Sequence, residues 1–120
     1  MHRSLLFAAL SFLPVTAFAA DDDAVLSDID ARYDETASVA RQLWEWAEVG
    51  YQEERSSKLL QDKLSSAGFS IRKGVADIPT AFIAEYGSGG PVIAILAEFD
   101  ALPGINQDDE PTRAPIEGKN

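Results

Sequence analysis

The sequence predicts an α/β fold in which two helices are followed by a strand and a β-hairpin. Apolar residues recur at helical spacing over residues 25–47 and again over residues 53–67, which is typical of helices that bury one face. Farther along, residues 92–97 form an unbroken apolar run that is followed by two carboxylates and a Pro-Gly pair. Such a run is typical of a strand buried on both faces, in a sheet covered by helices on both sides.

The first predicted helix, residues 25–47, is defined by one apolar stripe whose members lie three or four residues apart. They are Leu26, Ile29, Tyr33, Ala37, Ala40, Trp44 and Ala47. The helix begins either at Asp23 or at a capping box that starts with Ser27. Gly50 ends it. Trp44 continues the stripe and is expected in the core. Trp46, two residues later, faces a second layer or the surface.

The second predicted helix covers residues 53–67. Its inner face is formed by Leu60, Leu64 and Ala67. Gly68 follows it and is well suited to a left-handed cap. Glu53 and Glu54 lie in its first turn, where carboxylates interact favourably with the positive end of the helix dipole. Capping is the simpler interpretation of this acidic pair, and a catalytic role is the alternative.

Three strands are predicted after the helices. Residues 70–75 alternate in polarity, as in a half-buried or edge strand. Residues 80–86 are β-branched and aromatic, and a glycine-rich linker of about five residues joins them to the apolar run 92–97. Two strands joined in this way predict an antiparallel hairpin. Residues 105–120 have little to bury and are expected to form a loop.

The N-terminus has the pattern of a secretory signal peptide over residues 1–19. A basic residue, Arg3, precedes an apolar run at residues 5–15, and an Ala-Phe-Ala site ends at Ala19. The run is shorter than the roughly 20 apolar residues that a membrane-spanning helix needs, so no membrane span is predicted. A buried N-terminal helix is the alternative. The pattern predicts a mature chain of residues 20–120 that is exported, either to the periplasm or out of the cell.

Composition excludes several classes of function. The chain has 20 acidic and 10 basic residues, a net charge of −10 at pH 7, whereas nucleic-acid binding requires a basic surface. It contains no cysteine, and its only histidine, His2, lies in the predicted signal peptide. The mature chain therefore lacks the ligands of a Cys/His zinc site and the histidine of a Ser-His-Asp triad.

Two carboxylates, Glu98 and Asp100, follow the apolar run at a spacing of two residues. On an extended chain this spacing places both on the same side, and in open α/β sheets ligands bind beyond the carboxyl ends of the strands. A pair of this kind suits metal ligation, general base catalysis or the orientation of a histidine. The alternative is that the pair only solvates the strand end or caps a turn.

The predicted elements do not provide enough cover for the apolar run. Two helices can cover one face of a three-stranded sheet, but the run requires cover on both faces, and no third helix is predicted. The pattern therefore indicates the first part of a larger α/β domain.

Three sequence blocks carry a resemblance to a known family. They are residues 74–82 (GVADIPTAF), residues 87–89 (GSG) and residues 91–104 (PVIAILAEFDALPG). Together they resemble the metal-dependent amidohydrolase and peptidase family, which includes the aminoacylases and the carboxypeptidases that release glutamate from folates. The similarity is greatest to the aminobenzoyl-glutamate hydrolase and N-acyl-amino-acid amidohydrolase branch, and it covers roughly residues 48–107.

The resemblance implies that residues 20–120 are the N-terminal portion of a phosphorylase/hydrolase-like three-layer metallopeptidase catalytic domain. Many members have His-x-Asp at the end of this strand. Asp100 matches the Asp, which implies a catalytic role, whereas Glu98 stands at the position of the metal-binding His and departs from the ligand pattern. No metal ligand and no cofactor-binding residue is assigned in this chain.

The full-length family member would use a divalent metal, zinc or manganese, to hydrolyse an amide bond to a free amino acid. Its substrate would be a small N-acyl amino acid or peptide, and a homodimer is expected for the full-length protein. The 120-residue chain alone is expected to bind no metal and to be inactive. The alternative function is a small, acidic, exported binding or interaction domain without catalysis.

Overall fold

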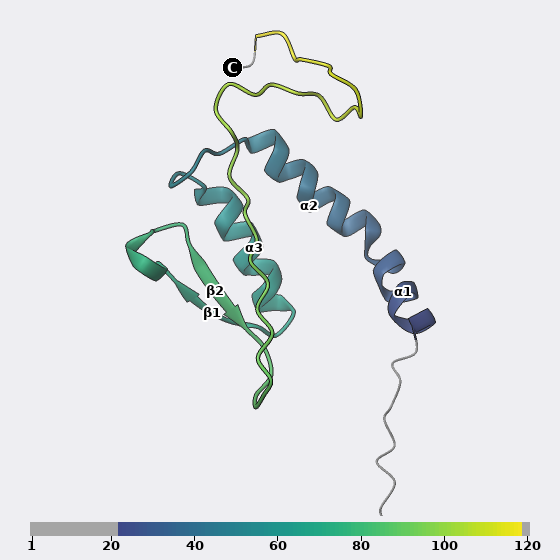
Figure 1. Cartoon of the computed structure of the whole chain (residues 1–120), viewed down its shortest axis with the longest axis vertical. Coiled ribbons are helices and arrows are strands. Elements are labelled where there is room, and N and C mark those ends of the chain that lie inside the picture. Colours follow the sequence, from purple (N-terminus) through teal and green to yellow (C-terminus); the bar gives the residue numbers. More distant parts are fainter. Residues whose placement is uncertain (1–21, 119–120) are drawn as a thin grey trace, which may run out of the picture. The chain divides into compact units, whose positions relative to one another are not determined.

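The computed structural model describes residues 22–118 and shows a mixed α/β fold. Within these residues there are three helices and one two-stranded antiparallel sheet (Figure 1). The described residues fall into two units, which divide between Tyr33 and Asp34. The predicted signal peptide, residues 1–19, lies outside the described residues. No described helix is both long enough and apolar enough to cross a bilayer.

The single helix predicted over residues 25–47 is wrong, because two helices occupy this stretch. Helix α1 is Asp22–Ala31 and helix α2 is Tyr33–Trp46. Between them the amide of Arg32 bonds to the carbonyl of Ile29, three residues back, instead of making the bond to i−4 that continues an α-helix. Hydrophobic spacing reports which face is apolar and does not register such a local change of hydrogen bonding.

Helix α1 begins within one residue of the earlier predicted start, Asp23, and places Ser27 inside the helix. Asp22 and Asp23 lie in its first turn, where they complement the helix dipole. An ion pair of 2.9 Å joins Arg32 to Asp28 one turn away. None of the side chains of α1 is buried.

Trp44, on α2, is not in the core as predicted, because 39% of its surface is exposed. Its indole N–H donates a hydrogen bond of 3.2 Å to the backbone carbonyl of Gln107. A residue on the apolar face of a helix is buried only where another helix or a sheet packs against it. The segment that reaches Trp44, residues 105–118, is a loop. That loop folds back on itself through backbone bonds such as Asp108 to Ala114, and its predicted lack of helix and strand is confirmed.

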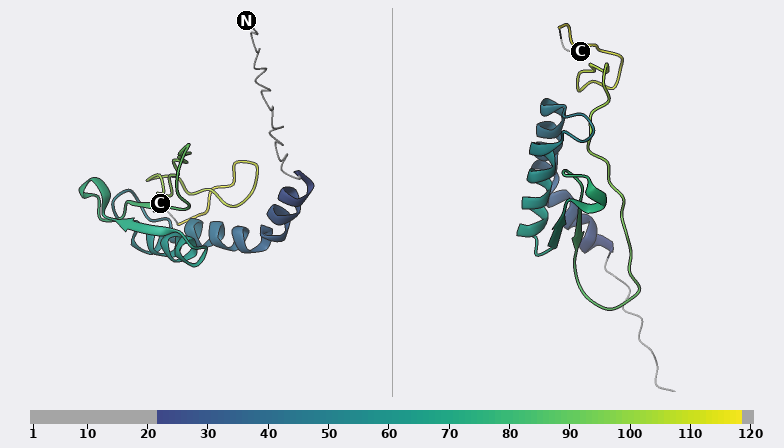
Figure 2. Two further views of the ribbon diagram at one scale, coloured as in Figure 1. Left: turned by 90° about the horizontal axis from the view of Figure 1, so that it is seen from below. Right: turned by 90° about the vertical axis from the view of Figure 1, so that its left-hand side faces the viewer.

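Helix α3 is Glu54–Ser66, close to the prediction, and Gly68 follows it with the left-handed φ of 91° expected of a cap. Strands β1, Ser70–Lys73, and β2, Phe82–Glu85, lie within their predicted ranges. They pair antiparallel with Ser70 opposite Glu85. Between them, Val75–Asp77 forms a 3-10 turn. Helix α3 lies alongside this sheet (Figures 1 and 2).

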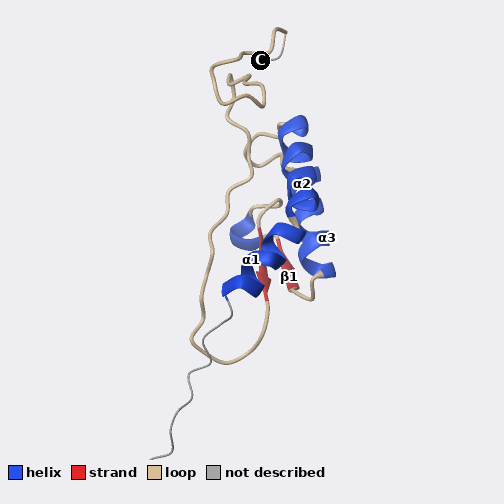
Figure 3. Ribbon diagram, turned by 90° about the vertical axis from the view of Figure 1, so that its right-hand side faces the viewer, coloured by secondary structure: helices blue, strands red, loops and turns tan. Residues whose placement is uncertain are grey.

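The predicted hairpin between residues 80–86 and 92–97 is wrong in this structure. Strand β2 pairs with β1, and residues 91–100 form neither helix nor strand (Figure 3). A strand needs a hydrogen-bonded neighbour, and an apolar strand also needs side-chain cover on its faces. Residues 92–97 have neither among the described residues, and their side chains are exposed to solvent.

The buried side chains of the described residues are polar. No described hydrophobic residue is fully buried. The buried residues are Glu53, Ser56, Ser57, Gln61 and Thr80. All but Thr80 come from the start and first turns of α3, and Thr80 precedes β2. The best-enclosed part of the structure is therefore a polar cluster at the beginning of α3, which directs attention to this region as a candidate site.

Candidate functional site

Asp100 is held beside the segment that leads into α3. The amide of the next residue, Ala101, donates a 2.8 Å hydrogen bond to the backbone carbonyl of Glu48, and Val49 and Ala101 form an isolated parallel β-bridge. On the other side of Asp100, the ring of Phe99 lies 6.1 Å from that of Phe82 in β2. Contacts on both flanks thus fix the backbone at Asp100, although the preceding run is exposed.

Gly50 lies between two carboxylates. A Cβ atom built on it would be 3.7 Å from Oδ2 of Asp100 and 3.9 Å from Oε1 of Glu53. The structure therefore brings Asp100 and Glu53 close to one backbone position. Glu98, the other acid of the sequence pair, has an exposed side chain.

The side chain of Glu48 caps α3. Its Oε2 accepts the amide of Ser56 at 2.8 Å, and its Oε1 accepts both the amide and the side-chain Nε of Arg55 at 3.1 Å. Burial raises the pKa of Glu48, but the hydrogen bonds from Ser56 and Arg55 outweigh this effect and lower the pKa to about 2. Glu48 is therefore a carboxylate at neutral pH, fixed against the positive end of the helix.

Sequence reasoning assigned the capping role to Glu53 and Glu54 and missed Glu48. Glu53 stands at the N-cap position but makes no side-chain capping bond. Glu48 reaches the helix because the intervening loop turns back on itself, with Tyr51 in the left-handed region at φ 67°. Nothing in the spacing of the acids reveals this turn. The available signal was only an acidic residue followed by glycine shortly before a helix.

Glu53 belongs to the buried polar cluster. Its Oε2 accepts the hydroxyl of Thr80 at 2.7 Å, while the carbonyl of Thr80 accepts the hydroxyl of Ser57 at 2.5 Å. Gln61 donates to the same Ser57 oxygen at 2.8 Å. Burial raises the pKa of Glu53, but the hydrogen bonds from Thr80 and from backbone amides lower it more. Glu53 is thus held as a carboxylate, and its bond to Thr80 ties α3 to the start of β2.

The described residues do not fit the divalent metal that the resemblance implies. Within residues 22–118, no group of three or more His, Cys, Asp or Glu side chains is arranged to hold a metal ion. Of the two carboxylates beside Gly50, Glu53 already uses one oxygen for Thr80.

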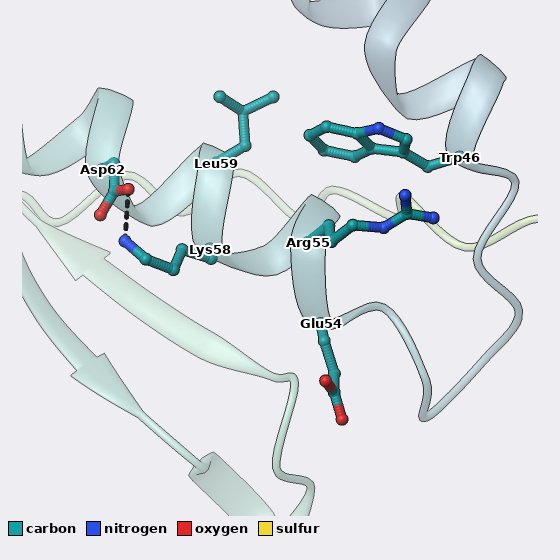
Figure 4. Close-up of a pocket in the computed structure, with 6 residues that line it drawn as sticks. All are labelled: Trp46, Glu54, Arg55, Lys58, Leu59 and Asp62. Carbon is teal, nitrogen blue, oxygen red and sulfur yellow. Dashed lines mark hydrogen bonds and ion pairs between the residues drawn. The ribbon is translucent and has the colours of Figure 1, made fainter.

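An open hollow of about 450 Å³ lies beside the first turns of α3 (Figure 4). Its lining residues are Trp46, Glu54, Arg55, Lys58, Leu59 and Asp62. The guanidinium of Arg55 lies 5.1 Å from the ring centroid of Trp46, and Lys58 forms a 2.6 Å ion pair with Asp62. Because Arg55, Lys58 and Asp62 pair with other side chains and Asp100 is not among the lining residues, this hollow is not the candidate catalytic site.

Comparison with known proteins finds relatives that are hydrolases or peptidases by name. The chain is 44% identical over 86 residues to one subunit of the p-aminobenzoyl-glutamate hydrolase of Escherichia coli (strain K12), a match that covers 72% of this chain and 17% of that subunit. Its homologues therefore include amidohydrolases, and the resemblance inferred from the sequence blocks is confirmed at partial coverage. It is also 36% identical over 72 residues to IAA-amino acid hydrolase ILR1-like 5 of Arabidopsis thaliana, covering 59% of this chain and 16% of the relative.

A third relative, thermostable carboxypeptidase 1 of Saccharolobus solfataricus, is 28% identical over 94 residues, covering 77% of this chain and 24% of the relative. The chain thus spans only about a sixth to a quarter of the length of these curated relatives. No family model matches the chain. No solved structure matches it either.

Proposed function

We propose that this chain is the N-terminal part of a metal-dependent amidohydrolase that cleaves an amide bond to a free amino acid, in an N-acyl amino acid or an aminobenzoyl-glutamate. The observation that carries the proposal is the 44% identity to the E. coli p-aminobenzoyl-glutamate hydrolase subunit over 72% of the chain. The mixed α/β structure is compatible with it. In the complete domain, residues 92–97 become a strand of a three-layer catalytic fold.

Asp100 is the catalytic residue that we propose within this chain. It follows the apolar run, as ligand-binding residues follow strands in open α/β sheets, and its backbone is held on both flanks by Phe99 and Ala101. A carboxylate fixed in this way suits the orientation of a neighbouring ligand or the transfer of a proton. Glu98, which is exposed, receives no ligand role in this proposal.

The divalent metal, zinc or manganese, would be held by residues of the complete enzyme that lie outside this chain. When bound, such an ion polarises a carbonyl and activates a water molecule. The 120-residue chain by itself is then inactive. For the complete protein we propose small amide substrates, export directed by residues 1–19, and a homodimer.

The alternative, a small exported binding domain that folds independently, has less support. A domain of this size relies on an apolar core for stability, and none of the hydrophobic residues among 22–118 is fully buried. Four large apolar side chains of the run are instead exposed to water.

A chimera tests the proposal. The segment of the E. coli subunit that matches this chain would be replaced by the 86 matched residues of this chain, and the product assayed with p-aminobenzoyl-glutamate and with N-acetyl amino acids in the assembly in which that subunit normally acts. We expect measurable hydrolysis of at least one of these amides. A chimera that folds, as judged by circular dichroism and size-exclusion chromatography, but hydrolyses none of them would contradict the proposal.

A further inference from the structure

Glu48 contacts two separate segments, one through its side-chain carboxylate and the other through its backbone carbonyl. Its carboxylate binds the amides of Arg55 and Ser56 at the start of α3, at 3.1 and 2.8 Å. Its backbone carbonyl accepts the amide of Ala101 at 2.8 Å. One residue therefore joins the helix end to the position that follows Asp100.

The connection at Ala101 also determines where the Asp100 carboxylate lies. With Val49 bridged to Ala101, Asp100 lies next to Gly50, where its Oδ2 would be 3.7 Å from a Cβ atom built on the glycine. The other flanking contact is the ring pair of Phe99 and Phe82, whose centroids are 6.1 Å apart; it is an apolar contact, whereas a hydrogen bond weakens steeply when its angle changes. The hydrogen bond at Glu48 is thus the more directional of the two.

The loop around Glu48 needs the carboxylate to keep its shape. Tyr51 has a left-handed φ of 67°, a conformation that costs free energy for a residue with a side chain and persists only when surrounding contacts enforce it. The charge-assisted bonds from Glu48 to α3 supply such contacts. Within the loop, the amide of Gln52 also bonds to the carbonyl of Val49 at 3.0 Å, but the bonds from Glu48 attach the loop to the start of α3. Without them the loop can shift against α3, and the carbonyl that accepts the amide of Ala101 shifts with it.

We propose that Glu48 is a positioning residue for Asp100, acting by fixing the loop 48–53 on α3 and thereby the backbone of Ala101. This inference rests on the proposed function, in which Asp100 is the catalytic carboxylate. Glu48 itself is occupied by α3 and does not contact the substrate. Because small displacements of a catalytic group are costly to the reaction rate, the loss of Glu48 should lower kcat more than it changes KM.

The first test uses amide hydrogen exchange, measured by NMR on the chimera described above and on three variants of it. Glu48→Ala should accelerate exchange at both Ser56 and Ala101, each by about tenfold. Glu48→Gln, which keeps an acceptor of the same size, should restore part of the protection. The matched control Glu54→Gln, an exposed acid in the first turn of α3, should leave Ala101 unchanged. Unprotected Ala101 in the folded parent chimera, or faster exchange at Ser56 alone in Glu48→Ala, would overturn the inference.

The second test measures kinetics in the chimera described above. Glu48→Ala should lower kcat by about 10- to 100-fold with KM changed by no more than about twofold, and Glu48→Gln should recover part of the loss. Equal kcat in Glu48→Ala and the parent would overturn the positioning role. A parent chimera without activity would count against the proposed function only, since the exchange measurements need no catalysis and decide the inference by themselves.

Discussion

Leu96 offers the sharpest test of the apolar run, because its side chain is 92% exposed in the described structure. In the 120-residue chain, Leu96→Ser removes apolar surface from water, so we expect the free energy of unfolding to change by less than about 0.5 kcal/mol. In the complete hydrolase that we propose, the same side chain lies in a buried strand. There the substitution should cost about 2–5 kcal/mol, because it removes packed methyl groups and buries a hydroxyl.

The free energy that burial of the whole run would contribute follows from the exposure of its side chains. Its large side chains, Val92, Ile93, Ile95 and Leu96, are 85–92% exposed. Burying each contributes about 1.5–3 kcal/mol, so full cover would contribute about 6–12 kcal/mol, comparable to the total stability of a typical domain. The isolated chain should therefore bind an apolar dye, and Leu96→Ser should reduce that fluorescence.

Urea unfolding followed by circular dichroism, on the 120-residue chain and on the chimera, measures both effects. Leu102→Ser is the matched control, since Leu102 is 66% exposed but lies outside the run. It should leave the dye signal of the isolated chain nearly unchanged. A cost below about 0.5 kcal/mol for Leu96→Ser in the chimera would refute the reasoning, because a buried strand cannot lose a leucine without penalty.

Three further predictions concern Glu48, the polar cluster and the metal. The pKa of Glu48 is lowered from 4.5 to about 2, so its contribution to the free energy of unfolding is about 3 kcal/mol at most. This contribution is complete above pH 4.5 and is lost as the pH falls from 4.5 to 2. In an acid titration followed by circular dichroism, helicity should fall over this range, and Glu48→Gln should make that fall smaller. Thr80→Val leaves the buried Glu53 without its hydroxyl partner and should destabilise the chain by about 1–3 kcal/mol in urea unfolding, whereas Thr80→Ser should retain most of the stability. The purified chain with added zinc or manganese should hydrolyse no N-acyl amino acid, and metal-dependent turnover in that assay would contradict its assignment as an incomplete site.

The elements that the sequence predicted well are those whose signals are local. Helix α3 has an amphipathic pattern and a terminal glycine that adopts the expected left-handed conformation. Strands β1 and β2 have short β-prone sequences bounded by turn residues, and each lies within its predicted range. Side-chain spacing and turn chemistry determine such elements without reference to distant parts of the chain.

The features that could not be predicted depend on contacts distant in the sequence or on backbone detail. The apolar run at residues 92–97 has the composition of a strand, but a strand exists only with a paired neighbour, and β2 pairs with β1 instead. The capping of α3 by Glu48 requires a turn through Tyr51, and no pattern in the sequence predicts this turn. The approach of Asp100 to Glu53 across Gly50 follows from that same turn.

The most direct test of the proposed function is the effect of Asp100→Asn on kcat in the chimera with the E. coli hydrolase. If Asp100 orients a ligand or transfers a proton, kcat should fall by about 10²- to 10⁴-fold, while Glu85→Gln, a change at the exposed end of β2, should leave kcat within about twofold of the parent value. A correctly folded Asp100→Asn chimera that keeps the parent kcat would contradict the account.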